Sequence, residues 1–281
     1  MTTAIVGAGG QLGRALTARL PDAVALYRAD LDITDPAAVG SHDWSGVDVL
    51  INAAASTDVD GAETPEGRVV AWAANATAVA HLAAAANTHR MTLVHISSEY
   101  VFDGTVTDPI VEETPLCPLS CYGAAKAAGE IAATLAARHL VVRTTWVMGD
   151  GDNFVRTMLG LAARGVSPTV VDDQIGRPTF ADDLAAGIVA LLGAPSGVYH
   201  LTNTGEPASW ADITRATFTL AGRDPADVTG TTTAAYFADK PHAARRPLNS
   251  VLDLTKAAAA GVTLPPWRES LAAYVKLELG R

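Results

Sequence analysis

The sequence predicts a doubly wound parallel α/β sheet followed by a smaller C-terminal domain. Three observations support this fold class. Short apolar segments alternate with alanine-rich segments over the first half of the chain, which is the order of a chain of βαβ units. The apolar segments show almost no polar alternation, as expected for strands that are covered on both faces. A glycine-rich turn follows the first apolar segment, where such a sheet binds ligands.

The strands and helices of this first part can be placed by residue. The apolar segments predict strands over 3–7, 23–27, 47–55, 91–98 and 140–146. The segments between them are rich in alanine, the residue with the highest helix propensity. They predict helices over 13–20, 69–90 and 121–139.

The regular alternation ends after Trp146. A loop and a helix over 148–165 precede a strand and a loop over 168–179. A helix over 180–193 and a strand over 197–202 are expected to return to the main sheet. From about residue 203, Pro and Gly turns separate short helices, which predicts a small cap. We therefore assign 1–145 with about 166–202 to the main domain, and about 146–165 with 203–281 to the second domain.

Composition and charge exclude several classes of function. The chain has 281 residues, 49% of them hydrophobic, and a formal net charge of −10. An acidic chain has no general attraction for nucleic acid or for anionic lipid. No unbroken run of about 18 apolar residues predicts a membrane span, and the N-terminus "MTTAIVGAGG" lacks the features of a signal peptide. We expect a cytoplasmic protein in which Cys117 and Cys121 are structural thiols.

The turn "IVGAGGQLG" predicts a dinucleotide site. Gly7, Gly10 and Gly13 lie between the first strand and the first helix, three residues apart. Glycine permits a tight turn and lets the backbone approach a pyrophosphate. The N-terminus of the next helix then points its free N–H groups at the phosphates. The same glycines could form a plain tight turn, but their position between strand and helix favours the dinucleotide.

The end of the second strand bears on cofactor choice. Arg28 is nearest the strand end, and Asp30 and Asp32 follow it in "YRADLDITD". An acid here binds the ribose diol of NADH, whereas an arginine accepts the 2′-phosphate of NADPH. Arg28 favours NADPH, although it could equally be a solvated surface residue, and NADH remains possible.

Three polar residues predict acid–base chemistry beside this cofactor. Tyr122 and Lys126 are four residues apart at the start of a helix, so both can face one site. A nearby ammonium lowers the pKa of a phenol towards working pH. Ser98 ends the fourth strand, at the edge of the sheet where ligands bind, and can donate to a carbonyl. The order Gly–Ser–Tyr–Lys is a stronger signal than the Tyr–Lys pair alone.

The sequence resembles the extended short-chain dehydrogenase/reductases and, within them, the dTDP-4-dehydrorhamnose reductase family. The resemblance spans nearly the whole chain. It rests on "GAGGQLG", "LDITD", "INAAASTDVDGAE", "ISSEYVFDG", "YGAAKAAGE", "VVRTTWVMG", "NFVRTML", "DDQIGRPT", "GVYHLTN", "ARRPLNSVLD" and "LPPWRESL". The later motifs are specific to the sugar reductases and therefore carry more weight than the glycines.

The resemblance implies a Rossmann-like dinucleotide-binding domain, a C-terminal substrate-binding domain, and a set of site residues. Tyr122 and Lys126 would contact the cofactor and, with Ser98, carry the chemistry. With the glycine turn and Arg28, the cofactor contacts would be Gly7, Gly10, Gln11, Leu12, Gly13, Asp32, Ile33, Ala55, Ser56 and Thr57. The sugar contacts would be Thr57, Val59, Ser98, Glu99, Tyr100 and Trp146.

Some of these assignments leave alternatives open. Trp146 could simply pack in the core, and Asn75 could be an ordinary hydrogen-bonded helix residue. The sequence also departs from the resembled family, which usually has Thr-Asp where this chain has Ser98-Glu99. It has Met148 and Gly61 where the family often has Tyr and Lys. These changes surround the sugar, so they affect the identity of the substrate and leave the type of reaction intact. We expect no metal site.

The expected reaction is reduction of the 4-keto group of a nucleotide-linked 6-deoxyhexose, with hydride from NADPH or NADH. Arg245 and Arg246 are the candidates for the substrate diphosphate, since arginine pairs with phosphate oxygens. They could also be a solvated surface pair. Two other functions stay open: a regulatory subunit that has lost catalysis, and an epimerase or dehydratase. The expected partner is a nucleotide-diphosphate sugar, and the protein would be a monomer or a homodimer.

Overall fold

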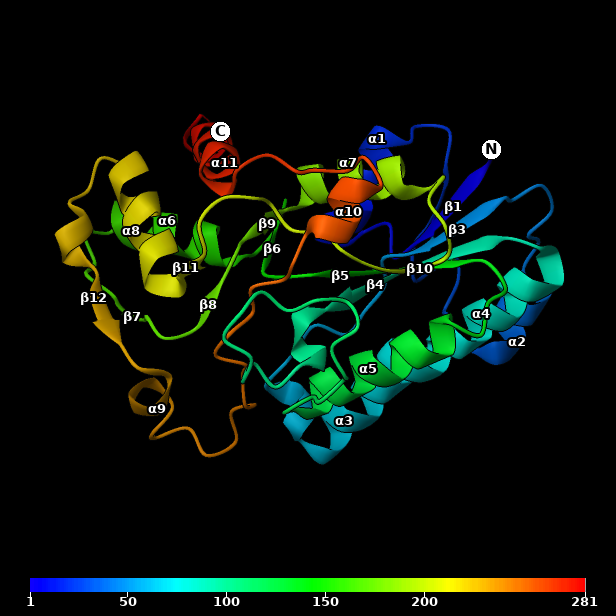
Figure 1. Ribbon diagram of the computed structural model, residues 1–281, viewed down its shortest axis with the longest axis horizontal. Coiled ribbons are helices and arrows are strands. Elements are labelled where there is room, and N and C mark those ends of the chain that lie inside the picture. Colours follow the sequence, from blue (N-terminus) through cyan, green and yellow to red (C-terminus); the bar gives the residue numbers. More distant parts are fainter. Residues whose placement is uncertain (281) are drawn as a thin grey trace.

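The computed structural model describes residues 1–280 and contains a six-stranded parallel sheet with helices on both faces (Figure 1). The sheet has the order β10-β5-β4-β3-β1-β2. Its strands are β1 (Thr3–Val6), β2 (Val24–Leu26), β3 (Val49–Asn52), β4 (Thr92–Ser98), β5 (His139–Thr144) and β10 (Gly197–His200). The chain runs outward from β1 to β2 and then crosses to β3 on the other side of β1. This reversal is the point where ligands bind in such sheets.

Helices cover the two faces of the sheet as two separate layers (Figure 1). One layer holds α1 (Gln11–Arg19), α7 (Ala181–Leu191) and α10 (Thr255–Ala259). The other holds α2 (Pro36–Ser41), α3 (Pro65–Trp72), α4 (Ala78–His89) and α5 (Cys121–Ala133). Each layer buries its own apolar cluster against the sheet, around Leu16 and Ile188 on one face and around Leu82 and Met91 on the other. The doubly wound fold is confirmed.

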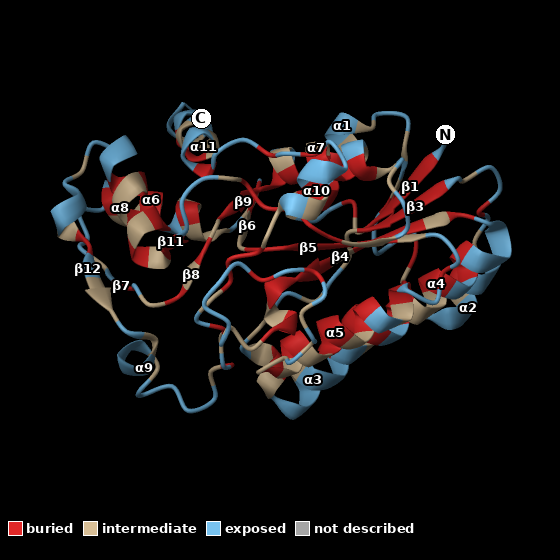
Figure 2. Cartoon of the chain, in the orientation of Figure 1, coloured by how far each residue is buried: buried red, intermediate tan, exposed pale blue. Residues whose placement is uncertain are grey.

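The helical segment predicted over 69–90 is one continuous stretch from Pro65 to His89. It comprises α3, a π-helical turn over Ala73–Thr77 (η2) and α4. The Thr64 hydroxyl caps its start, and Arg90, in the left-handed conformation, ends it. By length and mean hydropathy (1.5), this stretch is the one helix among residues 1–280 that could cross a membrane. Half of the apolar 18-residue window within it is buried, because α4 packs on α5 and on β4 (Figure 2).

A smaller lobe lies at one end of the sheet (Figure 1). Its helices are α6 (Phe154–Ala163), α8 (Trp210–Leu220), α9 (Thr233–Tyr236) and α11 (Trp267–Leu279). Its paired strands are β6 (Val147–Met148) with β9 (Thr179–Phe180), β7 (Thr169–Val171) with β12 (Thr229–Thr231), and β8 (Ile175–Gly176) with β11 (Ala208–Ser209). Short 3₁₀ turns complete the chain at Gly61–Glu63 (η1), Glu99–Val101 (η3) and Pro225–Asp227 (η4).

The lobe has its own apolar core, which includes Phe180, Ile213 and Trp267. Between the lobe strands, the chain returns to the main sheet as predicted. Helix α7 packs on α1, and β10 pairs with β5 in parallel, with Val198 opposite Val141.

Two predicted elements end three or more residues earlier than the sequence indicates. The helix predicted to reach 139 ends at Ala133, because the chain needs the following residues to turn into β5. The third strand ends at Asn52, where the predicted strand continued to 55. The Asn52 side chain accepts a hydrogen bond from the Ala54 backbone N–H (3.1 Å) and turns the chain out of the sheet.

Candidate active site

The glycine turn between β1 and α1 is closely packed. Gly7 has φ +78°, a conformation that side chains other than glycine rarely adopt. A Cβ atom on Gly7 would lie 2.5 Å from the Ala54 nitrogen, and one on Gly13 would lie 2.1 Å from the Gly7 oxygen. Gly10 is the N-cap of α1 and forms no side-chain cap. The turn therefore brings bare backbone N–H groups to the N-terminus of a helix, where an anion can bind.

A cavity of about 520 Å³ opens beside this turn, at the point where the strand order reverses. The residues that line it are Gly7, Gly10, Arg28, Leu31, Asp32, Ile33, Thr34, Ala53, Ala54, Ala55, Ser56, Val69, Val70, Ala73 and Ala74. They include seven of the predicted cofactor residues. Gln11 lies next to the turn, where its Oε1 accepts from the Gly149 N–H (2.6 Å) and its Nε2 donates to the Asp152 carbonyl (3.1 Å). It thus ties the glycine turn to the loop that enters the lobe.

Asn75 holds one wall of the cavity. Its Oδ1 accepts from the Ser56 N–H (2.9 Å), and its Nδ2 donates to the Ser56 carbonyl (2.9 Å). Asn75 lies in the π-helical turn, a distortion that often marks functional sites. Its amide fixes the loop that follows β3. The structure therefore gives Asn75 a positioning role, which the sequence had left open.

The rim of the cavity carries opposite charges. The Arg28 side chain is 85% exposed, and its Nη2 lies 3.8 Å from Asp32 Oδ2. Asp32 Oδ1 accepts hydrogen bonds from the Thr34 hydroxyl (2.7 Å) and backbone N–H (3.0 Å), which lower the Asp32 pKa. An exposed ion pair at this distance contributes little energy. Arg28 is thus free to turn towards a ligand in the cavity.

Tyr122 lies at the first turn of α5. The Ser120 hydroxyl caps this helix by accepting from the Gly123 N–H (3.1 Å), and Glu63 Oε1 accepts from the Cys121 N–H (2.7 Å). The Tyr122 ring packs edge-on against Tyr100, with 5.4 Å between ring centroids. Burial raises the Tyr122 pKa, the nearby Glu99 carboxyl raises it further, and the Ser98 hydroxyl partly offsets the shift. The phenol therefore stays protonated, as a proton donor requires.

Lys126 lies one turn after Tyr122 on the same helix. It is buried, and its Nζ donates to the Ile96 carbonyl (2.5 Å). Burial lowers the Lys126 pKa to about 8, although Glu130 opposes this shift. Lys126 does not reverse the effect of burial on the Tyr122 pKa. The sequence-based expectation of a lowered tyrosine pKa therefore does not describe this structure, because desolvation of the phenol dominates.

Ser98 is the last residue of β4, and Glu99 begins the 3₁₀ turn η3. The Ser98 hydroxyl donates to Glu99 Oε2 (2.7 Å) and accepts from the Tyr100 N–H (3.3 Å). Glu99 is 2% exposed, and burial raises its pKa to about 7, while the Ser98 hydroxyl, the Glu99 backbone and the Trp146 indole oppose the shift. Within the described residues, the other carboxyl oxygen, Oε1, has no hydrogen-bond partner.

Trp146 joins the sheet to the lobe. It follows β5 with φ +43°, a rare conformation for a bulky residue, and such strain is usually found at functional sites. Its ring stacks on Trp210 of the lobe, with 4.0 Å between centroids, and its indole lowers the Glu99 pKa. Trp146 thus interacts with both the lobe and the Glu99 carboxyl, which goes beyond ordinary core packing.

The two adjacent arginines, Arg245 and Arg246, differ in how far they are exposed. Arg245 is exposed, whereas the Arg246 side chain is only 16% exposed. Arg246 Nη2 donates to both Asp60 carboxyl oxygens (2.9 Å each), and its guanidinium lies over the Phe237 ring at 4.6 Å. Arg246 also lowers the Tyr100 pKa, although burial keeps that pKa raised overall. Arg246 thus lies close to Tyr100, and its partner Asp60 falls within the motif "INAAASTDVDGAE", which does not indicate this pairing.

The remaining predicted substrate residues, Val59 and Thr57, lie on the segment that follows β3. Val59 packs with Tyr100 and Tyr122, and Thr57 is exposed on the loop that follows β3. Cys117 and Cys121 are free thiols. Among residues 1–280, no group of three His, Cys, Asp or Glu side chains could hold a metal ion.

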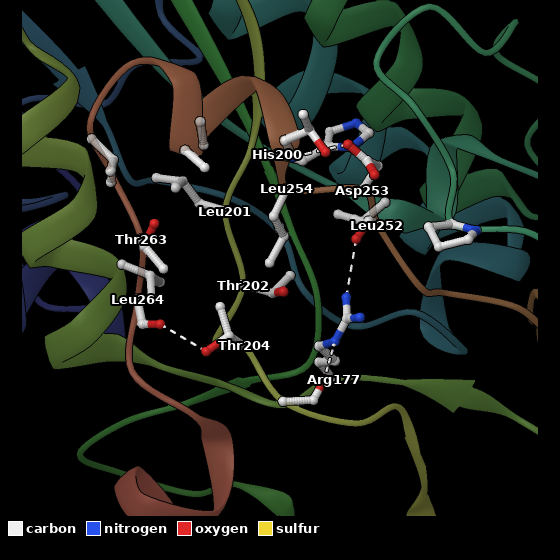
Figure 3. Close-up of a pocket in the computed structure, with 16 residues that line it drawn as sticks. Arg177, His200, Leu201, Thr202, Thr204, Leu252, Asp253, Leu254, Thr263 and Leu264 are labelled. Atoms are coloured by element: carbon white, nitrogen blue, oxygen red, sulfur yellow. Dashed lines mark hydrogen bonds between the residues drawn. The ribbon is translucent and has the colours of Figure 1, made fainter.

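A second cavity, of about 310 Å³, lies between the end of β10 and the segment that includes α10 (Figure 3). It contains none of the predicted catalytic side chains. Its cation, Arg177, donates to the Gly205 carbonyl (2.7 Å) and the Leu252 carbonyl (3.1 Å). Arg177 thus joins two segments of backbone.

Comparison with known proteins identifies a matching family and three similar proteins. A family described as "RmlD substrate binding domain" matches residues 1–279. A dTDP-4-dehydrorhamnose reductase from Aggregatibacter actinomycetemcomitans is 39% identical, over 95% of this chain and 96% of its own. The crystal structure of a dTDP-4-dehydrorhamnose reductase from Clostridium acetobutylicum has a TM-score of 0.91 and 37% identity, covering 99% and 100% of the two chains. The Bacillus anthracis enzyme, in complex with NADP, has a TM-score of 0.89 and 32% identity, over 99% of both chains.

Proposed function

The chain belongs to the RmlD substrate binding domain family, and from this premise we propose that it is an NADPH-dependent 4-ketoreductase of a nucleotide-linked 6-deoxyhexose. The nucleotide is dTDP, and the reaction serves deoxysugar biosynthesis. One observation carries the proposal. Ser98 ends strand β4, and Tyr122 and Lys126 lie near the start of helix α5. These are the positions at which the resembled family has its Ser or Thr, its Tyr and its Lys. Two relatives support the same function: both are named dTDP-4-dehydrorhamnose reductase, and one of them was solved in complex with NADP.

The other two functions fit less well. A dehydratase on this fold would be expected to carry Asp-Glu in place of Ser98-Glu99, and Glu99 alone does not supply that acid pair. A regulatory subunit would be expected to lack part of the catalytic set, which this chain retains in full.

The residues around the first cavity fit a nicotinamide dinucleotide. The glycine turn packs closely against β3 and against its own backbone because Gly7 and Gly13 have no Cβ, and a backbone without side chains can approach a pyrophosphate. Gly7, Gly10, Gln11, Leu12 and Gly13 would hold the pyrophosphate, and Ala55, Ser56 and Thr57 would follow the cofactor past β3. Arg28 would meet a 2′-phosphate, and Asp32 and Ile33 would border the adenosine. The bound cofactor supplies the hydride.

The chemistry at the sugar carbonyl falls to three side chains. Tyr122 donates a proton to the 4-keto oxygen as the carbonyl is reduced. Lys126, buried one helical turn away, would hold the nicotinamide ribose and stabilise the phenolate that forms. Ser98 orients the carbonyl by a hydrogen bond.

The sugar nucleotide would bind between the two parts of the chain. We assign 1–145 with about 166–202 to the dinucleotide part, and about 146–165 with 203–281 to the substrate part. Sugar contacts come from Thr57, Val59, Ser98, Glu99, Tyr100 and Trp146, and Arg245 and Arg246 meet the diphosphate. We further propose that the protein is cytoplasmic, is a monomer or a homodimer, and has no nucleic-acid, membrane or metal partner.

The direct test is a substrate panel. The purified protein is incubated with NADPH and a set of nucleotide-linked 4-keto-6-deoxysugars, and loss of the reduced cofactor is followed by absorbance. We expect the fastest oxidation with a dTDP-linked sugar. Oxidation no faster than with NADPH alone, for every sugar, would exclude the proposal.

Arg28→Ala is expected to weaken NADPH binding by about tenfold or more and to leave NADH binding nearly unchanged. A charge-assisted contact to a phosphate contributes roughly 1.5–3 kcal/mol. The measurement is the dissociation constant of each cofactor for both proteins, with NADH as the internal control. An equal loss for both cofactors, or no loss, would place Arg28 outside the 2′-phosphate site.

Arg246→Ala is expected to raise KM for the nucleotide sugar by about tenfold or more, since it removes a cation with several N–H donors. The effect should weaken as salt rises. Arg245→Ala should raise KM less, because Arg245 is exposed. Arg138→Ala, an exposed arginine on the loop after α5, is the matched control. Inhibition by free dTDP that is unchanged in Arg246→Ala would show that Arg246 does not hold the diphosphate.

A further inference from the structure

The Ser98 hydroxyl has one proton, and in this structure the Glu99 carboxyl is an acceptor within reach of it. Ser98 Oγ donates to Glu99 Oε2 at 2.7 Å and accepts from the Tyr100 N–H at 3.3 Å. An ionised carboxylate only accepts hydrogen bonds, so it must take the Ser98 proton. Ser98 then offers a substrate carbonyl nothing but lone pairs. The geometry therefore conflicts with the donor role that the reaction gives to Ser98.

A proton on Glu99 would remove this conflict. A carboxylic acid can donate its O–H to Ser98 Oγ, which frees the Ser98 proton to turn towards the substrate. The surroundings of Glu99 favour this neutral form, because the side chain is 2% exposed and Oε1 has no hydrogen-bond partner among the described residues. A buried charged oxygen without a partner is costly.

The charged and titratable groups around Glu99 do not supply a counter-charge. From α5, Tyr122 is a buried phenol, and Lys126 is engaged by the Ile96 carbonyl. From the 3₁₀ turn, Tyr100 is a second phenol, and beyond it Arg246 pairs with Asp60. From the loop after β5, Trp146 contributes an uncharged N–H. The Glu99 pKa is raised to about 7 by burial, with no ionic contribution that lowers it.

We infer that Glu99 is a positioning residue that works as a neutral acid and sets the direction of the Ser98 hydroxyl. Ser98 donates to the substrate carbonyl only while Glu99 holds its proton. This inference rests on the proposed function and adds a fourth residue to the Ser–Tyr–Lys set.

The proton balance of the reaction does not change. The carbonyl carbon gains a hydride, and its oxygen gains the proton of Tyr122, which solvent later replaces. Glu99 ends the cycle with the proton it began with. Because its pKa is raised relative to an exposed glutamate, the active form is present below about pH 7 and is lost as pH rises through that value.

The first test follows the Glu99 proton directly. Carboxyl-carbon NMR of the glutamate-labelled protein gives one resonance that disappears in Glu99→Gln, and its shift is followed against pH. We expect a midpoint near about 7, and a higher midpoint in Ser98→Ala, which removes a hydrogen bond that favours the carboxylate. A midpoint near about 4, the ordinary value for a carboxyl group, would overturn the inference whatever the enzyme does.

The second test follows the rate. Between about pH 6 and pH 8, kcat/KM of the wild type should fall about tenfold, while Glu99→Gln, whose amide can donate to Ser98, should stay flat. Lys126 has a pKa of about 8, so loss of its proton should change the rate of both proteins above that pH. Glu113→Gln, at a side chain 75% exposed, is the matched control and should keep the wild-type profile.

The outcomes separate the inference from the proposed function. A Glu99→Gln profile that falls like the wild type, or a rate lowered more than about a hundredfold at pH 6, would overturn the role of Glu99. A wild type that reduces no nucleotide-linked keto sugar would overturn the proposed function and the role of Ser98 together. The titration would still decide whether Glu99 holds a proton at neutral pH.

Discussion

Replacement of Tyr122 by Phe is expected to lower kcat by about 10²–10⁴-fold and to leave cofactor binding largely intact. The variant removes the hydroxyl that gives the proton and keeps the ring that packs edge-on against Tyr100. Single-turnover rates with saturating NADPH measure the loss at the chemical step. Cofactor titration by fluorescence measures binding independently.

Tyr199→Phe provides the matched control for this loss. The Tyr199 hydroxyl donates to the Pro195 carbonyl (2.9 Å) on the edge strand β10, away from the first cavity. Its removal costs about 1 kcal/mol of stability and should not change kcat. A Tyr122→Phe variant that turns over like the wild type would make Tyr122 a packing residue.

The second large effect is expected at the buried ion pair that holds α5 on the sheet. Glu130 of α5 accepts from Arg143 Nε (2.9 Å) and Nη2 (2.8 Å) of β5, and both side chains are 4% exposed. Glu130→Ala leaves a buried guanidinium without its counter-charge. We expect the free energy of unfolding to fall by about 3–5 kcal/mol, as measured by urea denaturation.

A double variant tests the physical reason for that loss. Glu130→Leu combined with Arg143→Met removes both charges and refills the space, so it should be more stable than Glu130→Ala. A Glu130→Ala protein as stable as the wild type would show that the pair does not fix α5. Because Glu130 also raises the Lys126 pKa, its loss should lower that pKa further.

Much of the fold could be predicted, because local patterns determine it. Buried parallel strands leave unbroken apolar segments, and the glycine turn has a required place between strand and helix. The end of a helix is harder to predict, and α5 ends at Ala133 because β5 must begin, not because a residue breaks the helix.

The site could be predicted only in part. Tyr122 and Lys126 share a helix face by their spacing, and Ser98 follows from its strand. The Arg246–Asp60 pair joins residues 186 positions apart, and no local pattern indicates it. The raised pKa values of Tyr122 and Glu99 depend on burial by segments far along the chain, which spacing cannot show.

The central claim is that this chain reduces the 4-keto group of a nucleotide-linked 6-deoxyhexose with hydride from NADPH. NADPH that carries deuterium at the transferred position tests it most directly, with the product analysed by NMR and mass spectrometry. We expect a single deuterium at C4 of the sugar for each cofactor oxidised, and none with Tyr122→Phe over the same time. Deuterium at another carbon, or a sugar changed without cofactor oxidation, would contradict the account.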